Sequence, residues 1–133
     1  MQKIRVAAII IKGKKILFVK GSDKYKEYWT PGGKLEEGET ELECLKRELK
    51  EELNVKFTSA KFYKEYISES FYKKGLILLN KVYIVNIKGE LKPGKEVKSY
   101  FWISKPEFIK KKSFFIPVTR DNIIPDLISD RYY

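Results

Sequence analysis

Alternating apolar and polar segments predict a chain built largely of β-strands. Residues 3–11 and 16–20 are rich in β-branched side chains, and Gly13 lies among lysines between them. We therefore expect these two segments to form a hairpin. Three later segments also predict strands, and the second of them is almost continuously apolar, as is typical of a central strand. They are residues 55–68, 75–87 and 97–103.

A different spacing predicts a helix at residues 40–53. Four leucines recur there at every third or fourth position, so they share one face of a helix. These are Leu42, Leu45, Leu49 and Leu53. Thr40 and Glu43 have the spacing of a capping box, which favours a helix that begins at Thr40. Asn54 tolerates the left-handed conformation in which many helices end.

Two shorter helices complete the predicted set of elements. Residues 106–110 indicate one, and residues 119–130 indicate a terminal helix that is interrupted near Pro125. Strands that surround one strong helix and are followed by another predict a mixed central sheet between helices. We therefore expect an α/β (α+β) fold, a three-layer αβα sandwich, in a single domain of residues 1–133.

The composition excludes histidine-based catalysis, an intrachain disulfide and a membrane-spanning helix. The chain has no histidine, which excludes histidine-based acid–base catalysis and histidine-containing triads. Its single cysteine, Cys44, excludes an intrachain disulfide. No apolar run approaches the ~20 residues that a membrane-spanning helix needs. We expect a soluble, cytoplasmic protein with no membrane partner, as a monomer or a homodimer.

The charge balance favours an anionic ligand. Lys and Arg number 28 against 18 Asp and Glu, which gives a net charge of +10. A basic surface attracts polyanions such as nucleotides and nucleic acid. The lysines are spread along the whole chain, which is typical of a solvated surface rather than of a dedicated nucleic-acid patch. RNA therefore remains an alternative partner.

Three carboxylates lie together on the predicted helix. Glu48, Glu51 and Glu52 cluster on a face about 110° from the leucines, because residues three and four apart are neighbours on a helix. Their mutual repulsion would be relieved by a bound cation, and carboxylate oxygens suit Mg²⁺ or Mn²⁺. Taken alone, the same residues are also compatible with an ordinary solvated helix face.

The wider pattern resembles the Nudix box, Gly-x5-Glu-x7-Arg-Glu-apolar-x-Glu-Glu-x-Gly-apolar. Eight positions agree between residues 33 and 55, and the preceding residues 29–33, WTPGG, resemble the usual approach to the box. The one departure is Asn54 where the family usually has glycine, and both residues accept the left-handed geometry. The matching residues are Gly33, Glu39, Arg47, Glu48, Leu49, Glu51, Glu52 and Val55.

The resemblance implies a role for each matching polar residue. Glu48, Glu51 and Glu52 would bind Mg²⁺ or Mn²⁺, with the Gly33 carbonyl as a further ligand. Glu39 and Arg47 would form a salt bridge that supports the turn into the helix, where Arg47 would also orient the catalytic carboxylates. A general base often lies outside the box in this family, so Glu96 and Glu52 are the two candidates.

The implied activity is metal-dependent pyrophosphohydrolysis of a nucleoside diphosphate linked to another group. Tyr28, Tyr72 and Lys34 are candidate substrate-binding residues. A nucleoside triphosphate, an oxidised dNTP or a dinucleoside polyphosphate is favoured over ADP-ribose, because the region ISESFYKK lacks the proline of ADP-ribose hydrolases. The alternatives are a catalytically quiet module that binds a nucleotide or RNA, and an RNA 5′ pyrophosphohydrolase.

Overall fold

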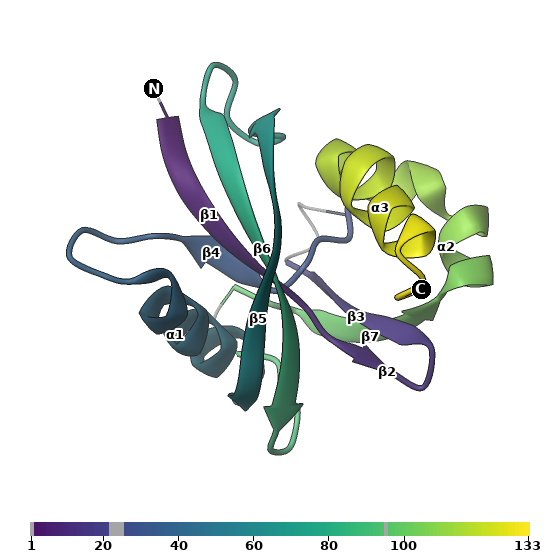
Figure 1. Ribbon diagram of the computed structural model, residues 1–133, viewed down its shortest axis with the longest axis horizontal. Helices are drawn as coiled ribbons and strands as arrows, with labels where there is room; N and C mark the ends of the chain where they lie inside the picture. The colour runs from purple at the N-terminus through teal and green to yellow at the C-terminus, as the bar shows by residue number, and fades with distance from the viewer. Residues whose placement is uncertain (1, 22–25, 95) are drawn as a thin grey trace.

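A computed structural model describes residues 2–21, 26–94 and 96–133, and it contains two β-sheets with helices on either side (Figure 1). The larger sheet has the strand order β4-β1-β6-β5. Strand β1 runs parallel to β6, whereas the β1–β4 and β5–β6 pairs are antiparallel, so this sheet is mixed. Its strands are β1 (Gln2–Ile9), β4 (Gly32–Lys34), β5 (Lys56–Glu69) and β6 (Ile77–Lys88).

The smaller sheet is antiparallel and contains the predicted hairpin in a shorter form. Its order is β2-β3-β7, with β2 (Ile11–Lys12), β3 (Lys15–Lys20) and β7 (Ser99–Ser104). Gly13 and Lys14 both have positive φ, which is the geometry of a tight two-residue hairpin turn between β2 and β3. The rest of the first apolar segment leaves the hairpin, because β1 pairs instead with β4 and β6 in the larger sheet.

Helices cover both sides of the strands, and the predicted α/β (α+β) sandwich with a mixed sheet is confirmed. Alternate residues of β1 supply two separate cores, since neighbouring side chains of a strand point to opposite faces. Val6 and Ala8 pack in the core of α1 (Glu41–Leu53), whereas Ala7 and Ile9 pack in the core of the C-terminal helices. Those helices are α2 (Lys105–Lys110), η1 (Lys112–Phe114), η2 (Thr119–Ile123) and α3 (Ile124–Ser129).

Helix α1 has the predicted ends and a slightly different buried face. The capping box of Thr40 and Glu43 is present, and Asn54 ends the helix with a φ of 58°. Leu45, Leu49 and Leu53 are fully buried, but Leu42 is 45% exposed and Cys44 is buried in its place. The buried face is therefore rotated toward Cys44, whose thiol lies against the carbonyls of β4.

The predicted terminal helix is present, with a change of helical pitch inside it. Its first part, η2, is a π-helical turn, and α3 continues from it with Pro125 in its first turn. Tyr66 of β5 donates a hydrogen bond to Asp126 at 2.7 Å, which fastens α3 to the sheet. No helix of the described ranges is long and apolar enough to cross a membrane.

Candidate active site

Two consecutive glycines bring β4 against both β1 and α1. A Cβ on Gly32 would lie 2.0 Å from the carbonyl oxygen of Val6, and Gly32 has a φ of +142°. A Cβ on Gly33 would lie 2.3 Å from the carboxyl carbon of Glu48. Glycine is therefore required twice, once so that β4 pairs closely with β1, and once so that the Glu48 carboxylate lies over the strand.

Glu52 is the most enclosed acid of the helix. Its side chain is 8% exposed and accepts a hydrogen bond from the Gly32 N–H at 2.8 Å. Burial raises the pKa of Glu52 to about 8, although the Gly32 hydrogen bond and the charge of Arg5 oppose the shift. Burial also raises the pKa of Glu48, and the hydrogen bond from Arg47 opposes it.

Arg47 ties the preceding loop to the acidic face of α1. Its Nε and Nη2 atoms donate to the two oxygens of Glu39 at 2.8 and 3.0 Å, and its Nη1 donates to Glu48 at 2.7 Å. The predicted Glu39–Arg47 salt bridge is thus present in a bidentate form. The hydrogen bonds from Arg47 lower the pKa of Glu39 to about 2.

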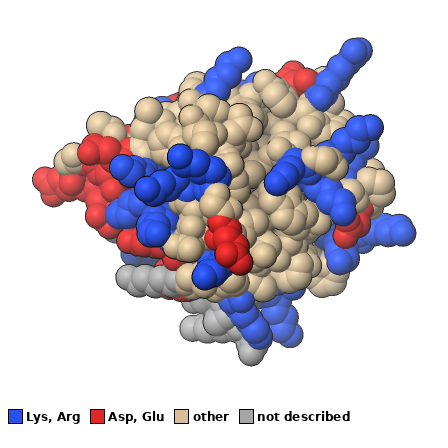
Figure 2. Space-filling model, turned by 90° about the horizontal axis from the view of Figure 1, so that it is seen from below, with Lys and Arg blue, Asp and Glu red and all other residues tan. Residues whose placement is uncertain are grey.

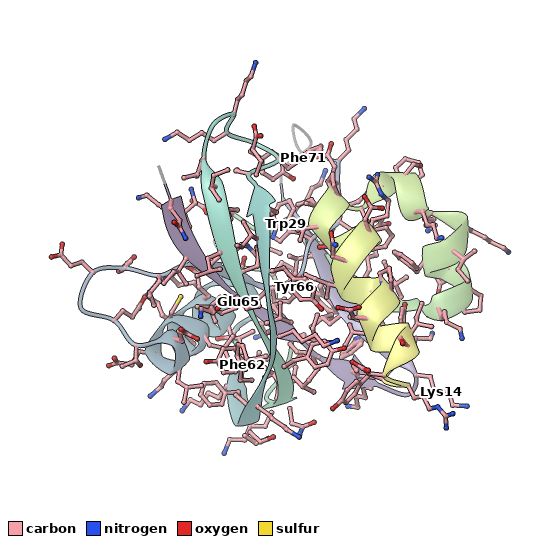
Figure 3. The ribbon with its side chains drawn as sticks, turned by 45° about the horizontal axis from the view of Figure 1, so that its top comes forward. Lys14, Trp29, Phe62, Glu65, Tyr66 and Phe71 are labelled. Carbon is pink, nitrogen blue, oxygen red and sulfur yellow. The ribbon has the colours of Figure 1, made fainter. Side chains whose placement is uncertain are left out.

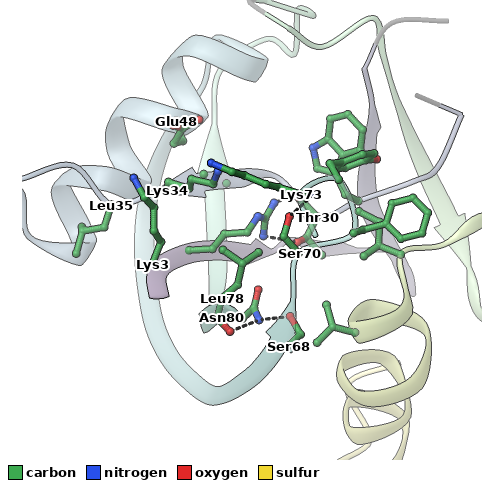
Figure 4. Close-up of a pocket in the computed structure, with 18 of the residues that line it drawn as sticks. Lys3, Thr30, Lys34, Leu35, Glu48, Ser68, Ser70, Lys73, Leu78 and Asn80 are labelled. Atoms are coloured by element: carbon green, nitrogen blue, oxygen red, sulfur yellow. Dashed lines mark hydrogen bonds between the residues drawn. The ribbon is translucent and has the colours of Figure 1, made fainter. Parts of the chain in front are cut away.

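The acidic helix opens onto a cleft of about 660 Å³. Strands β1, β4 and β6 of the larger sheet line its floor, and the segment that leads into η2 lines the opposite wall. Figure 4 shows lysines from β1, β4 and the β5–β6 loop at its mouth, near Glu48. These are Lys3, Lys34 and Lys73. An anionic ligand would therefore meet positive charge at the entrance and carboxylates beside it.

The structure brings most of the predicted site residues to this cleft. Glu48, Glu52, Gly33, Lys34, Tyr72 and Glu96 all line it. Arg47, Glu39 and Asn54 lie behind it and support α1, because they contact the loop or end the helix.

Two predicted residues lie elsewhere. The Glu51 side chain is 41% exposed on the flank of α1, with its carboxylate 3.6 Å from Arg47. Tyr28 is buried in the other core, where its ring stacks on Phe115 and meets the edge of Phe101. Packing between these aromatic rings turns Tyr28 away from the described cleft residues, and Tyr72 and Trp29 occupy the cleft instead.

Sequence reasoning missed several residues of the cleft. Trp29 lines it, and Figure 3 shows Trp29 toward the same end of the sheet as Phe71, another lining residue. Arg5 and Asn80 also line it. The signal that would have indicated them is a polar residue inside an apolar strand, since a buried polar group needs a specific reason to be there.

The donor set suits a hard divalent cation. Among the described residues, no group of three or more His, Cys, Asp and Glu side chains is arranged to hold a metal ion. Two carboxylates, Glu48 and Glu52, nevertheless lie at the cleft beside the Gly33 backbone, and the negative charge of Glu48 contributes to the raised pKa of Glu52. Carboxylate and carbonyl oxygens are the ligands that Mg²⁺ prefers.

Glu96 lies on a turn that is fastened to the end of α1. The Gly94 N–H donates to the Glu52 carbonyl at 2.8 Å, and a Cβ on Gly94 would lie 1.9 Å from the Glu51 carbonyl oxygen. Glu96 follows in a left-handed conformation, with a φ of 63°. Its negative charge contributes to the raised pKa of Glu52, so the two acids share one electrostatic environment.

Comparison with known proteins identifies the class to which this fold and cleft belong. The sequence matches the family described as NUDIX domain over residues 1–127. It is also 37% identical over 125 residues to the 8-oxo-dGTP diphosphatase of Buchnera aphidicola subsp. Schizaphis graminum, covering 92% of this chain and 90% of that protein. The chain therefore belongs to the Nudix family, as a MutT-like hydrolase with pyrophosphatase activity.

Solved structures agree on the fold. The Nudix hydrolase from Nitrosomonas europaea superimposes with a TM-score of 0.80 at 21% identity, over 99% of this chain and 89% of that one. The MutT protein from Methanosarcina mazei Go1 gives a TM-score of 0.77 at 21% identity, over 90% and 88% of the two chains. At this identity they show the same architecture and leave the substrate open.

Proposed function

We propose that this chain is a divalent-metal-dependent nucleoside triphosphate pyrophosphohydrolase, acting as one domain, whose substrates include an oxidised dNTP. The observation that carries the proposal is the pair of enclosed carboxylates, Glu48 and Glu52, at a cleft whose mouth carries three lysines. Carboxylates beside a cationic entrance suit a ligand that brings both phosphates and a metal ion.

Glu48, Glu52 and the Gly33 carbonyl would hold Mg²⁺ or Mn²⁺, with Glu51 as an outer ligand. The bound ion would neutralise phosphate oxygens and lower the pKa of a water molecule. Arg47 orients Glu48 through its 2.7 Å hydrogen bond. The Gly32 N–H holds one oxygen of Glu52 and leaves the other for the ligand.

Glu96 is the proposed general base, and Glu52 a metal ligand. Both acids line the cleft, but only Glu52 is bound to the β4 backbone, which suits a fixed ligand better than a group that moves a proton. Glu96→Gln should then lower kcat and leave Mg²⁺ affinity unchanged, whereas Glu52→Gln should weaken Mg²⁺ binding as well. The reverse pattern would exchange the two roles.

Nucleotide recognition is supported by the aromatic residues beside the lysines. Trp29 and Tyr72 meet edge to face at 6.1 Å between ring centroids, and Phe71 meets Tyr72 at 5.1 Å. Such rings provide apolar area for a base or a sugar. The relative from Buchnera is named for 8-oxo-dGTP, which supports an oxidised purine among the substrates.

A product-release screen tests the proposal. The panel contains nucleoside triphosphates, 8-oxo-dGTP, diadenosine polyphosphates, ADP-ribose and 5′-triphosphate RNA, each with Mg²⁺ or Mn²⁺ and with a chelator. We expect metal-dependent cleavage of nucleoside triphosphates, reduced about 10²-fold or more by Glu52→Gln. Glu90→Gln, an exposed acid outside the cleft, serves as the matched control and should retain activity.

The two alternative functions predict different results in the same screen. An RNA 5′ pyrophosphohydrolase needs a continuous basic strip. Figure 2 shows basic side chains scattered over the visible face, with acidic ones gathered on the side of α1. Selective cleavage of 5′-triphosphate RNA would favour the RNA enzyme. Folded protein that binds nucleotides and cleaves none would favour the binding module.

A further inference from the structure

Two polar residues lie side by side on the floor of the cleft, within strands that are otherwise apolar. Arg5 of β1 and Asn80 of β6 are direct neighbours in the parallel register of the larger sheet. Both line the cleft, so both point to its side of the sheet. A cationic and an amide side chain are rare in a central strand pair, which indicates that this part of the floor contacts a polar ligand.

Asn80 is held in one orientation. Its side chain is 2% exposed, and its amide nitrogen donates to the Ser68 hydroxyl at 2.9 Å and to the Tyr66 carbonyl at 3.1 Å. A backbone carbonyl only accepts, so the amide cannot be turned around. Figure 4 shows the side-chain oxygen on the side away from Ser68. Asn80 therefore offers the cleft an acceptor and withholds its donors.

Arg5 is held in a complementary way. Its Nη1 and Nη2 atoms donate to the hydroxyl and the carbonyl of Thr30, at 3.2 and 2.7 Å. Thr30 is buried and leads into the two-glycine strand, so the guanidinium has a rigid anchor. A guanidinium carries five N–H donors. Those that Thr30 does not bind have no hydrogen-bond partner within the described part of the chain, and Arg5 lines the same cleft as Asn80, so they are donors for a ligand there.

The surroundings fit a flat ring between the sheet and the C-terminal helices. Leu78 lies beside Asn80 on the floor, and Val118 and Ile123 form the opposite wall. Thr119, at the start of η2, adds a buried hydroxyl. This region lies on the same cleft as Glu48 and Glu52, so one ligand can place its ring here and its phosphates at the carboxylates.

We propose that Arg5 and Asn80 read the edge of the nucleobase and select a keto group next to a ring N–H. This inference rests on the proposed function. The keto oxygen accepts from Arg5 and the neighbouring N–H donates to Asn80. Guanine, 8-oxoguanine, hypoxanthine and uracil share this edge. Adenine and cytosine carry an amino group in place of the keto oxygen. The N–H groups of that amino group would face the N–H groups of Arg5, so two donors would meet without an acceptor.

Substrate pairs that differ only at this edge test the inference. ITP and ATP differ at the keto or amino group of C6, and UTP and CTP differ in the same way at C4. For each we measure kcat/KM with Mg²⁺ and take the ratio within each pair. We expect both ratios to favour the keto base by about tenfold or more, since each well-formed base contact discriminates on this scale.

Variants assign the preference to the two residues. Arg5→Met and Asn80→Leu should each bring both ratios close to one. The matched controls are Arg120→Met and Asn86→Leu. The Arg120 guanidinium pairs with Asp121, and the Asn86 amide of β6 donates to Ser59 of β5, as the Asn80 amide donates to Ser68 of β5. Both controls should keep the wild-type ratios. A ratio measured on one preparation does not depend on the folded fraction, so a partly unfolded variant still gives an answer.

The outcomes separate this inference from the proposed function. Cleavage of ITP and ATP at equal kcat/KM, or a preference for ATP and CTP, would overturn the inference that Arg5 and Asn80 select the nucleobase. The proposed pyrophosphohydrolase activity would be unaffected by that result. If wild-type protein cleaves no triphosphate, the proposed function fails. The selection of the nucleobase is then tested by measuring the binding of IMP and AMP through quenching of tryptophan fluorescence. Tighter binding of IMP, lost in Asn80→Leu, supports it, and equal binding overturns it.

Discussion

At the scale of single residues, the site depends on charges that the fold places in costly positions. Glu52 is enclosed next to Glu48, and within the described ranges the Gly32 N–H and Arg5 compensate its charge. An arrangement of this kind lowers the stability of the fold, and it holds the proposed metal ligand in place. The charge of each residue therefore has a measurable effect on folding as well as on activity.

Glu52→Gln should stabilise the metal-free protein at alkaline pH. The folded pKa of about 8 is raised above the ordinary value of 4.5, so the contribution of the carboxyl to stability is complete below pH 4.5. It declines as the pH rises from 4.5 through about 8. Denaturant unfolding with a chelator should show the variant more stable than wild type at pH 9, with the difference vanishing at pH 4. A pH-independent difference would contradict the raised pKa.

Arg47→Lys tests the opposite sign at Glu39. The folded pKa of Glu39 is lowered to about 2 from 4.5, so its contribution to stability is present above pH 4.5 and is lost as the pH falls toward 2. Lysine keeps the charge but lacks the planar fork that contacts both oxygens. We expect a lower melting temperature at pH 7 and a smaller difference near pH 2. Equal melting temperatures at pH 7 would show that the fork is dispensable.

At the residue scale, the sequence could place side chains together where their spacing is local. Glu48 and Glu52 are neighbours on one helix, so their spacing alone places both on the same cleft. Arg5 and Asn80 become neighbours only through strand pairing, which no local pattern reveals. Tyr28 was indistinguishable from Tyr72 as a stacking residue, because its aromatic partners in the core come from distant segments.

At the scale of elements, the site depends on the contact between the end of α1 and the turn that carries Glu96. The Gly94 N–H donates to the Glu52 carbonyl, and the Lys92 N–H donates to the Leu53 carbonyl. These carbonyls lie in the last turn of α1 and have no acceptor role within the helix, so the turn provides their hydrogen bonds. The turn thus closes the helix, and the helix holds the turn in register with the cleft.

Gly94→Ala should disturb both elements together. The added Cβ would lie 1.9 Å from the backbone oxygen of Glu51, and a backbone atom cannot move aside as a flexible side chain can. We expect a loss of about 3 kcal/mol in unfolding free energy and reduced turnover. Pro93→Ala, at the exposed neighbouring position, is the control and should change the unfolding free energy little. An unperturbed Gly94→Ala variant would mean that the turn is not docked on the helix.

The helices could be predicted more completely than the sheets. Helix α1 is specified by its own sequence, because the capping box and Asn54 mark its two ends. Partner choice in the sheets depends on distant segments, so the first apolar segment gave the hairpin of β2 and β3 without indicating that β1 joins β6. The exposure of Leu42 has a similar origin, since the strands beneath α1 decide which side of it is buried.

At the scale of the whole molecule, the two cores share the strands β1 and β3 and lie back to back. Val6 and Ala7 are adjacent in sequence and belong to different cores, as are Leu17 and Phe18. A disturbance of either core therefore reaches the other through the backbone of the same strand. The two helical layers are expected to unfold as one unit.

Thermal unfolding should accordingly follow a single transition by every probe. Near-ultraviolet circular dichroism and tryptophan fluorescence report mainly on the aromatic packing, whereas far-ultraviolet circular dichroism reports on the helices. We expect coincident midpoints, shifted upward together by Mg²⁺ with a non-hydrolysable nucleotide, because a ligand of the native state stabilises it by mass action. Separate midpoints would show that one helical layer melts alone.

The parallel pairing of β1 with β6 has a consequence for how the protein is made. Strand β1 leaves the ribosome before β6, and the floor of the cleft is incomplete until the segment that contains Asn80 arrives and pairs with β1. Contacts between such distant segments carry a large loop-closure cost and tend to slow folding. A nascent chain can therefore acquire the acidic helix long before it can hold a nucleotide, so ligand binding reports that the chain has completed its topology.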